Sequence, residues 1–299
     1  MILRLTLRRV IAVLALAALA AGAVSSCSYL DLKQREWIFR AQKTDRSGFE
    51  AYTQGVEEKW LAIPGNAERL HAWWWRAERP DAPTALYLHG TRSNLTGNAS
   101  RIARLRDAGF NVLAIDYRGF GRSGGELPEE QLTYQDAEIA WAHLRTLEPN
   151  SSRRFIYGHS LGGAVGIELA TRIDDATGLM LESTFTSIRD MVSVSAWGRW
   201  LPVGLILTQH FDSRTKIAKV AIPIFLMHGA RDRFVPATMS EELFAQAREP
   251  KQLWLVEGAS HFGVAGANVD EYSRRLLAFT TAATRTGATR AAALSPQAR

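Results

Sequence analysis

The sequence contains very little cysteine, since Cys27 is the only one among 299 residues. A single thiol cannot form a disulfide within the chain, which excludes a scaffold stapled by disulfides. No group of residues has the spacing of a metal site, and neither a phosphate-binding loop nor a dinucleotide fingerprint is present. We therefore expect no metal and no other cofactor.

Concentrated positive charge is also lacking. The formal net charge is +6, but lysines and arginines are interspersed with acidic residues and form no basic block in the interior. A nucleic-acid partner is therefore not expected. Apolar residues make up 46% of the chain and charged residues 22%, which is typical of a soluble globular protein with a packed core.

The N-terminus differs from the rest of the chain. Arg4, Arg8 and Arg9 precede an uncharged, apolar run from Val10 to Val24. A positive segment followed by an apolar segment of this length is typical of a signal peptide, and the run is short for a membrane-spanning helix of about 20 residues. We predict a signal peptide over residues 1–26, with an uncleaved N-terminal anchor as the alternative.

The next residues indicate how the exported chain is held. Val24-Ser25-Ser26-Cys27 resembles the lipobox of bacterial lipoproteins, which predicts lipidation of Cys27. An ordinary cleavage site with an incidental cysteine is the alternative. Ser28 after the cysteine favours the outer membrane of a Gram-negative cell, so we expect an envelope protein that faces the periplasm. Removing residues 1–26 lowers the formal charge from +6 to +3, because they contain three arginines and no acid.

The remainder divides into three parts. Residues 27–55 are polar, with weak apolar spacing, and are expected to form the lipidated N-terminus and a tether with a short helix. Residues 56–283 are expected to form one domain. Residues 284–299 are rich in Ala, Thr and Arg and are expected to be a disordered tail.

Short apolar runs alternate with helical periodicity throughout the domain. This pattern predicts an α/β fold with a mostly parallel sheet of eight strands flanked by helices, in which ligands bind at the carboxyl ends of the strands. The expected strands are residues 59–63, 70–75, 84–88, 112–115, 155–157, 178–181, 224–227 and 253–256. The expected helices are residues 102–108, 131–147, 161–173, 238–247 and 269–282.

Three adjacent tryptophans, Trp73, Trp74 and Trp75, lie on the second expected strand. Such a cluster can bind sugar or a membrane. Because neighbouring residues of a strand face opposite sides of the sheet, we instead expect core packing with one exposed ring.

One motif carries a nucleophile. The expected strand 155–157 leads into Gly158-His159-Ser160-Leu161-Gly162 and then a helix, which is the G-x-S-x-G nucleophile elbow in its strand-turn-helix setting. Glycines permit the tight turn that lifts the serine hydroxyl above the sheet. Ser160 is therefore the expected nucleophile.

A serine hydroxyl needs a base, and the base needs an acid to orient it. His261 is the only histidine after the last expected strand, and Asp232 follows the strand before it, in the chain order Ser, Asp, His. Glu182 and Asp116 also follow strands and are the rival acids.

Two backbone amides are expected to stabilise the oxyanion. The residue after the nucleophile and the loop after the third strand provide them in this arrangement, which indicates Leu161 and Thr91. Gly90 would let the backbone approach the substrate. His89 beside it is expected to be structural.

Together these motifs resemble the α/β-hydrolase superfamily. The resemblance covers about residues 59–282 and rests on Leu88-His89-Gly90, Asp116 to Ser123, Gly158 to Gly163, His228-Gly229 with Asp232, and Gly258 with His261. Residues 117–125 and 182–187 resemble the bud-emergence-type, membrane-associated hydrolases, although Thr91 stands where members of that group often have Asn.

The segment of about residues 186–220 is expected to be a small cap. Its apolar residues either bind an acyl chain or seal the core: Met191, Trp197, Trp200, Leu201, Pro202, Val203, Leu205 and Ile206. The expected activity is hydrolysis of a small-molecule or lipid carboxylic ester. A thioesterase or a peptidase of the same fold, and a non-catalytic envelope lipoprotein, remain alternatives.

Overall fold

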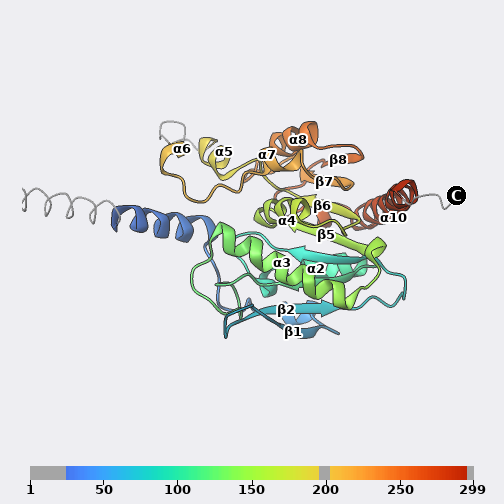
Figure 1. Ribbon diagram of the computed structural model, residues 1–299, viewed down its shortest axis with the longest axis horizontal. Coiled ribbons are helices and arrows are strands. Elements are labelled where there is room, and N and C mark those ends of the chain that lie inside the picture. The colour runs from blue at the N-terminus through green and yellow to red at the C-terminus, as the bar shows by residue number, and fades with distance from the viewer. Residues whose placement is uncertain (1–24, 195–202, 295–299) are drawn as a thin grey trace, which may run out of the picture.

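The computed structural model describes residues 25–194 and 203–294. Its centre is an eight-stranded sheet with the strand order β1-β2-β4-β3-β5-β6-β7-β8 (Figure 1). Strand β2 pairs antiparallel with β1 and β4, and all other neighbours are parallel, which confirms the predicted sheet. The strands are β1 (Glu57–Ala62), β2 (Arg69–Trp75), β3 (Thr84–Leu88), β4 (Asn111–Ile115), β5 (Arg154–His159), β6 (Gly178–Glu182), β7 (Ile224–Gly229) and β8 (Lys251–Val256).

Helices cover both faces of this sheet, so the central strands are continuous apolar runs. Every residue of β3 and β4 is buried. One face packs against α3 (Glu130–Leu147), α4 (Leu161–Arg172), α7 (Ser213–Ile217) and α8 (Ala237–Gln246). The other packs against α2 (Leu95–Asp107), α9 (Val264–Ala267) and α10 (Val269–Leu294). Two short 3₁₀ helices, η1 (Phe49–Tyr52) and η2 (Ser151–Arg153), complete the connections.

The three tryptophans of β2 are divided between the two faces, as their alternation predicts. Trp74 packs in the core under α3, and Trp73 and Trp75 pack in the core under α2. The expectation of one exposed ring is wrong, because all three are at most 2% exposed. Strand β2 lies between β1 and β4, and Phe49 stacks on Trp73 at a centroid distance of 6.0 Å. Neither face of the strand therefore meets solvent.

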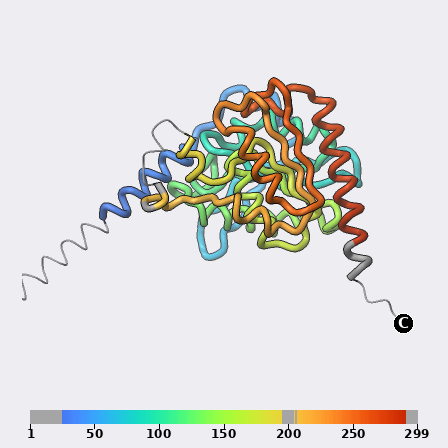
Figure 2. Tube along the Cα trace, turned by 90° about the horizontal axis from the view of Figure 1, so that it is seen from above, coloured from blue at the N-terminus to red at the C-terminus, as the bar shows by residue number. Residues whose placement is uncertain are grey.

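The N-terminal segment packs on the domain more closely than a tether would. Residues 25–39 are helical, and Arg35 donates to the carbonyl oxygens of Leu127 and Pro128. Phe39 at the end of this N-terminal helix is completely buried. The predicted tether with a short helix therefore contains the helix, but the second half of this helix packs on the domain. Its outer end projects from the body on the side opposite the end of α10 (Figures 1 and 2).

The C-terminal helix is longer than expected. Helix α10 continues to Leu294, so residues 284–294 are helical rather than disordered. Ala and Arg are strong helix formers. The helix is also held by tertiary contacts, since Ala283 is buried and the Thr284 hydroxyl donates to the carbonyl oxygen of Ser152 at 3.1 Å.

The expected cap contains α5 (Ile188–Ser193) and α6 (Val203–Ile206), followed by α7. Trp197, Trp200, Leu201 and Pro202 lie outside the described residues, as does most of the predicted signal peptide. Over the two described ranges, no helix is both long and apolar enough to cross a membrane.

Candidate active site

Ser160 lies at the sharp turn between β5 and α4. Its backbone has φ 55° and ψ −118°, a conformation that costs a non-glycine residue on the order of 1–3 kcal/mol. Three hydrogen bonds fix the turn: the Ser160 N–H donates to Glu182 O at 2.9 Å, and Ser160 O accepts from Gly163 N and the Thr184 hydroxyl, both at 2.9 Å. The serine is therefore presented at the carboxyl edge of the sheet in a strained, fully supported turn.

The elbow needs its glycines for space. A Cβ atom added to Gly162 would lie 2.0 Å from the carbonyl oxygen of Leu88 on the neighbouring strand. One added to Gly158 would lie 2.3 Å from Gly162 O. Real Cβ atoms do not approach backbone this closely, so any side chain at either position would push α4 away from β3 and β5.

His261 and Asp232 come together from two different loops. Asp232 follows β7, His261 follows β8, and the His261 Nδ1 atom lies 2.7 Å from Asp232 Oδ2. Because the carboxylate can only accept, Nδ1 carries the proton and the lone pair of His261 is on Nε2. This is the tautomer that a general base requires.

Asp232 is held in its charged form by four donors. Burial alone would raise its pKa, but hydrogen bonds from His228 and His261 outweigh burial and hold the pKa of Asp232 well below its usual value. The Phe234 and Val235 amides also donate to Oδ1, at 2.8 and 2.9 Å. The carboxylate is fixed in position and stays ionised across the physiological range.

Glu182, a rival for the role of the acid, is engaged elsewhere. Its carboxylate accepts from Arg101 Nε at 3.3 Å and from the Tyr157 hydroxyl, in a site where Glu182 is completely buried. The Tyr272 hydroxyl donates to Tyr157 at 3.0 Å and extends this network under the sheet. Glu182 therefore closes a buried ion pair rather than orienting His261.

Asp116, the other rival, supports a neighbouring loop. Its Oδ1 atom accepts from the Leu95 amide at 2.8 Å and lies 3.4 Å from Nε2 of His89. His89 is completely buried and packs on Tyr117 and Phe120 at centroid distances of 4.6 and 4.9 Å. Both residues hold the loop after β3 in place, which is the structural role expected for His89.

That loop brings Thr91 to the serine. A Cβ atom on Gly90 would lie 3.0 Å from the Cβ atom of Ser160, so the backbone of the loop passes directly beside Ser160. Thr91 and Leu161 line the same cavity as Ser160. Leu161 is the first residue of α4, so its N–H has no carbonyl acceptor one turn earlier in the helix and is available to a ligand.

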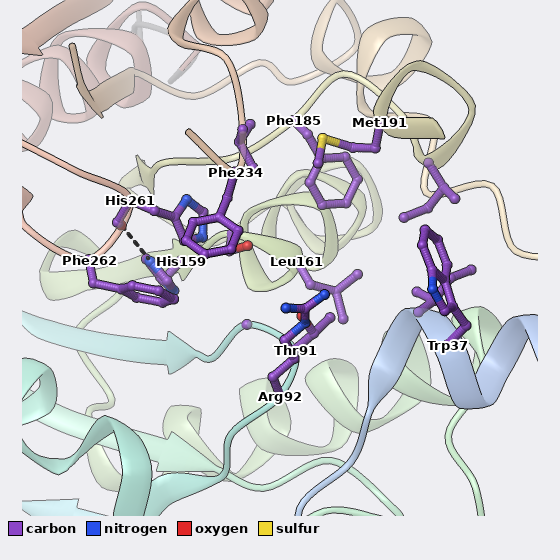
Figure 3. A pocket seen from close by; sticks show the side chains of 15 residues that line it. Trp37, Thr91, Arg92, His159, Leu161, Phe185, Met191, Phe234, His261 and Phe262 are labelled. Atoms are coloured by element: carbon purple, nitrogen blue, oxygen red, sulfur yellow. Dashed lines mark hydrogen bonds between the residues drawn. The ribbon is translucent and has the colours of Figure 1, made fainter. Parts of the chain in front are cut away.

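Ser160 and His261 line a cavity of about 350 Å³, within the range that holds a small organic ligand (Figure 3). Most of its wall is apolar. Trp37, Phe185 and Met191 lie at the end away from His261, and Phe234 and Phe262 lie near the histidine. The lining residues are Trp37, Ile38, Gly90, Thr91, Arg92, His159, Ser160, Leu161, Phe185, Ile188, Met191, Phe234, Val235, His261 and Phe262.

His159 contacts the backbone of His261. Its Nε2 atom lies 3.3 Å from the carbonyl oxygen of His261, shown as a dashed line in Figure 3, so Nε2 carries the proton. Burial, and then the charges of Arg101 and His261, lower the pKa of His159 well below its usual value. A neutral His159 therefore holds the backbone of the loop that carries His261.

Several of these residues were not anticipated from the sequence. Trp37 and Ile38 come from the segment expected to be a tether. Two adjacent apolar residues in a polar stretch were the available sign in the sequence that this segment packs on the domain. His159 is the variable residue of the elbow, and Arg92 follows the expected oxyanion residue. Within the ranges that the structure describes, no group of three or more His, Cys, Asp or Glu side chains could hold a metal ion.

Comparison with known proteins supports the same reading of the fold. The family model for serine aminopeptidase, S33, matches residues 81–212, which include Ser160 but neither Asp232 nor His261. An uncharacterized protein of Mycobacterium tuberculosis, Rv2307c, is 35% identical over 195 residues, which cover 64% of this chain and 68% of that protein.

Protein bem46 of Schizosaccharomyces pombe is 33% identical over 184 residues, 59% of this chain and 60% of that protein. The Pyrococcus furiosus esterase Pf2001 superimposes with a TM-score of 0.66 at 20% identity, covering 82% of this chain and 98% of the esterase. At this identity the esterase supports the fold alone.

Proposed function

The chain belongs to the α/β-hydrolase superfamily, and we propose that within it the protein is a serine hydrolase that cleaves carboxylic esters through an acyl-enzyme. Ser160 is the nucleophile, His261 the base and Asp232 the acid of this proposal. The observation that carries it is the 2.7 Å contact of His261 Nδ1 with Asp232 at a cavity that also exposes the strained Ser160.

The chemistry follows from these positions. His261 Nε2 takes the proton of Ser160 as Oγ bonds to the ester carbonyl carbon, and the carbonyl oxygen becomes an oxyanion that accepts from the Thr91 and Leu161 amides. His261 then gives its proton to the departing alcohol, which leaves an ester of Ser160. A water attacks this acyl-enzyme by the same route, releases the acid and restores the serine.

Two features favour an ester over a peptide substrate. An aminopeptidase needs an acidic side chain to bind the amino group of its substrate, yet none of the described residues that line the cavity is Asp or Glu. The segments outside the described ranges, residues 1–24, 195–202 and 295–299, contain no acidic residue either. The apolar wall near Trp37, Phe185 and Met191 suits an acyl chain instead.

A non-catalytic envelope protein is the alternative from another class. A binding scaffold has no need for a strained serine, an unpartnered helix N-terminus beside it and a correctly protonated histidine at one cavity. A single experiment separates the two classes. A fluorophosphonate reacts with a serine only where a base removes the proton and an oxyanion hole stabilises the product, so surface serines do not react.

We expect the probe to label the purified protein at Ser160, as read by peptide mass spectrometry, and Ser160→Ala and His261→Ala to abolish the label. Ser260→Ala is the matched control, because Ser260 is exposed beside His261 but does not line the cavity. A folded wild-type protein that takes up no probe would support the scaffold. A chain-length series of p-nitrophenyl esters, with thioesters and amino-acid amides of the same acyl groups, then separates esterase, thioesterase and peptidase activity.

The proposal extends to where the enzyme acts. We propose that residues 1–26 are removed as a signal peptide, that Cys27 is lipidated, and that the enzyme faces the periplasm from the outer membrane. Cys27 is exposed in the projecting N-terminal helix (Figure 1). Farther along the same helix, Trp37 lines the cavity and is 58% exposed. This arrangement would hold the cavity close to a membrane from which an apolar ester could enter.

A further inference from the structure

Arg92 is the only Lys, Arg, Asp or Glu among the described residues that line the cavity. It directly follows Thr91, and in Figure 3 its guanidinium lies beside Thr91 and Leu161, whose amides are the proposed oxyanion donors. A positively charged side chain therefore lies next to the place where the ester carbonyl would bind.

The backbone holds Arg92 in this position. Its φ angle is 62°, in the left-handed region that arginine rarely adopts and that costs an ordinary residue about 1–2 kcal/mol. The Arg92 N–H donates to the carbonyl oxygen of Phe39 at 3.0 Å, which ties this conformation to the end of the N-terminal helix. The contact fixes the backbone from which the exposed Arg92 side chain reaches the cavity.

Arg92 also differs from the arginines that serve structure. Arg101 and Arg118 pair with the buried carboxylates Glu182 and Asp136 at 3.3 and 2.6 Å. No carboxylate lies within 4 Å of the Arg92 guanidinium in the described part of the chain. An anion bound here would therefore meet a cation without a protein counter-charge. Partial burial of the side chain, and then the positive charge of Arg40, lower the pKa of Arg92.

We propose that Arg92 determines specificity by binding an anionic group of the substrate. The substrate is then an ester that carries an apolar acyl chain and, within a few atoms of the ester bond, a carboxylate or a phosphate. A guanidinium binds either group with two parallel hydrogen bonds. This inference rests on the proposed function, because it assigns the substrate class of the same site.

The orientation of the substrate follows from the cavity. His261 must reach the departing alcohol, so the alcohol lies toward His261 and the acyl chain toward Trp37 and Met191 at the other end (Figure 3). Arg92 lies between the two ends. The anion can therefore belong to a short acyl part or to the alcohol, and two pairs of substrates distinguish these sources.

The first pair is p-nitrophenyl valerate and the p-nitrophenyl half-ester of glutarate, which differ by a carboxylate in place of the terminal methyl group. The second pair is decanoylglycerol and decanoylglycerol phosphate, where the charge is on the alcohol. The full chain, purified in detergent, is tested with both. We expect kcat/KM for the anionic member of at least one pair to exceed that of its neutral partner by about tenfold or more.

Arg92→Gln should lower this anionic-to-neutral ratio at least tenfold, chiefly through KM, and Arg92→Lys should retain part of it. Arg79→Gln is the matched control, because Arg79 is exposed, pairs with Asp81 and lies before the amino end of β3, away from the cavity. Thermal unfolding checks that each variant is folded.

Two results would overturn the role of Arg92 and leave the proposed esterase activity standing. One is hydrolysis of the neutral esters with no preference for their anionic partners, and the other is an anionic-to-neutral ratio that Arg92→Gln leaves unchanged. No hydrolysis of any of the four esters would overturn both proposals.

Discussion

The imidazole of His228 lies 3.1 Å from the carboxylate of Asp232, on the same Oδ2 atom that accepts from His261. His228 Nε2 also lies 3.0 Å from Val235 O, and both neighbours are acceptors, so Nε2 carries the proton. Its Nδ1 then accepts from the Ser240 hydroxyl at 2.6 Å. A fully buried histidine thus holds the carboxylate of Asp232 from behind.

Replacing Asp232 with Asn should lower kcat by about three to four orders of magnitude, because an amide cannot hold His261 in the correct tautomer or compensate its charge. Ester hydrolysis is the measurement. The fold should persist, since Asn can keep acceptor contacts with the Phe234 and Val235 amides.

Glu182→Gln is the comparison, because Glu182 lies in the buried pair with Arg101 and not against His261. It should lower stability and leave kcat of the folded protein within about tenfold of wild type. A large loss of kcat in Glu182→Gln, together with a nearly unchanged kcat in Asp232→Asn, would show that Glu182 and not Asp232 is the acid.

Acid pH should destabilise the protein through His159. Its pKa is lowered well below the usual value of about 6.5, so below that pH the unfolded chain binds a proton that the folded protein excludes. Stability is therefore full above about pH 6.5 and falls as pH decreases, by about 1.4 kcal/mol per pH unit from this group until its folded pKa is reached.

His159→Gln removes the titrating imidazole. It should reduce the slope of the free energy of unfolding against pH by the same amount, measured by urea unfolding between pH 7.5 and 5. The comparison must be made against wild type at each pH. Burial raises the pKa of Asp136 to about 6, although Arg118 opposes this effect. This raised pKa stabilises the folded protein as pH falls, in the variant and in the wild type alike. Parallel slopes for the variant and wild type would show that His159 is protonated in the folded state.

The buried pair of Arg101 and Glu182 should dominate the stability of the loop behind His261. Arg101 also donates to the carbonyl oxygen of Phe262 at 3.4 Å, so it joins the buried network to the loop that carries His261. Arg101→Met leaves a buried carboxylate without its cation and should lower the free energy of unfolding by about 3–5 kcal/mol.

Glu182→Gln should lower the free energy of unfolding less in the Arg101→Met variant than in the wild-type protein. In the variant, the substitution removes a buried charge that has already lost its partner. Arg79→Met, which breaks an exposed pair with Asp81, should cost less than about 1 kcal/mol. Additive effects in the Arg101 and Glu182 cycle would mean that the two charges are not coupled.

Most of the fold could be predicted from the sequence because its signals are local. The buried strands are mostly apolar, and Gly158 and Gly162 mark a turn that only glycine permits. The tryptophans of β2 show the limit of such reasoning. Alternation predicts which face each ring occupies, but burial of the second face depends on Phe49, which is distant in the sequence.

The wall of the candidate site was less predictable for the same reason. Trp37 and Ile38 reach the cavity only because Arg35 bonds to the segment before α3 and places the N-terminal helix there. The choice between Asp232 and Glu182 likewise depends on Arg101, a partner 81 residues from Glu182 that no local pattern reveals. Contacts across such separations are set by the whole fold.

The anchor can be tested apart from the chemistry. Cys27→Ser should abolish palmitate labelling of the protein in cells and release it from the membrane fraction, because the only thiol of the chain is then absent. Residue 27 lies ten residues before Trp37 and far from the triad in the chain, so fluorophosphonate labelling of Ser160 in the purified variant should equal that of wild type. Equal palmitate labelling of both forms would refute lipidation at Cys27. Release from the membrane with loss of activity only toward esters presented in vesicles would indicate that the anchor serves to deliver an apolar substrate to a cavity beside the membrane.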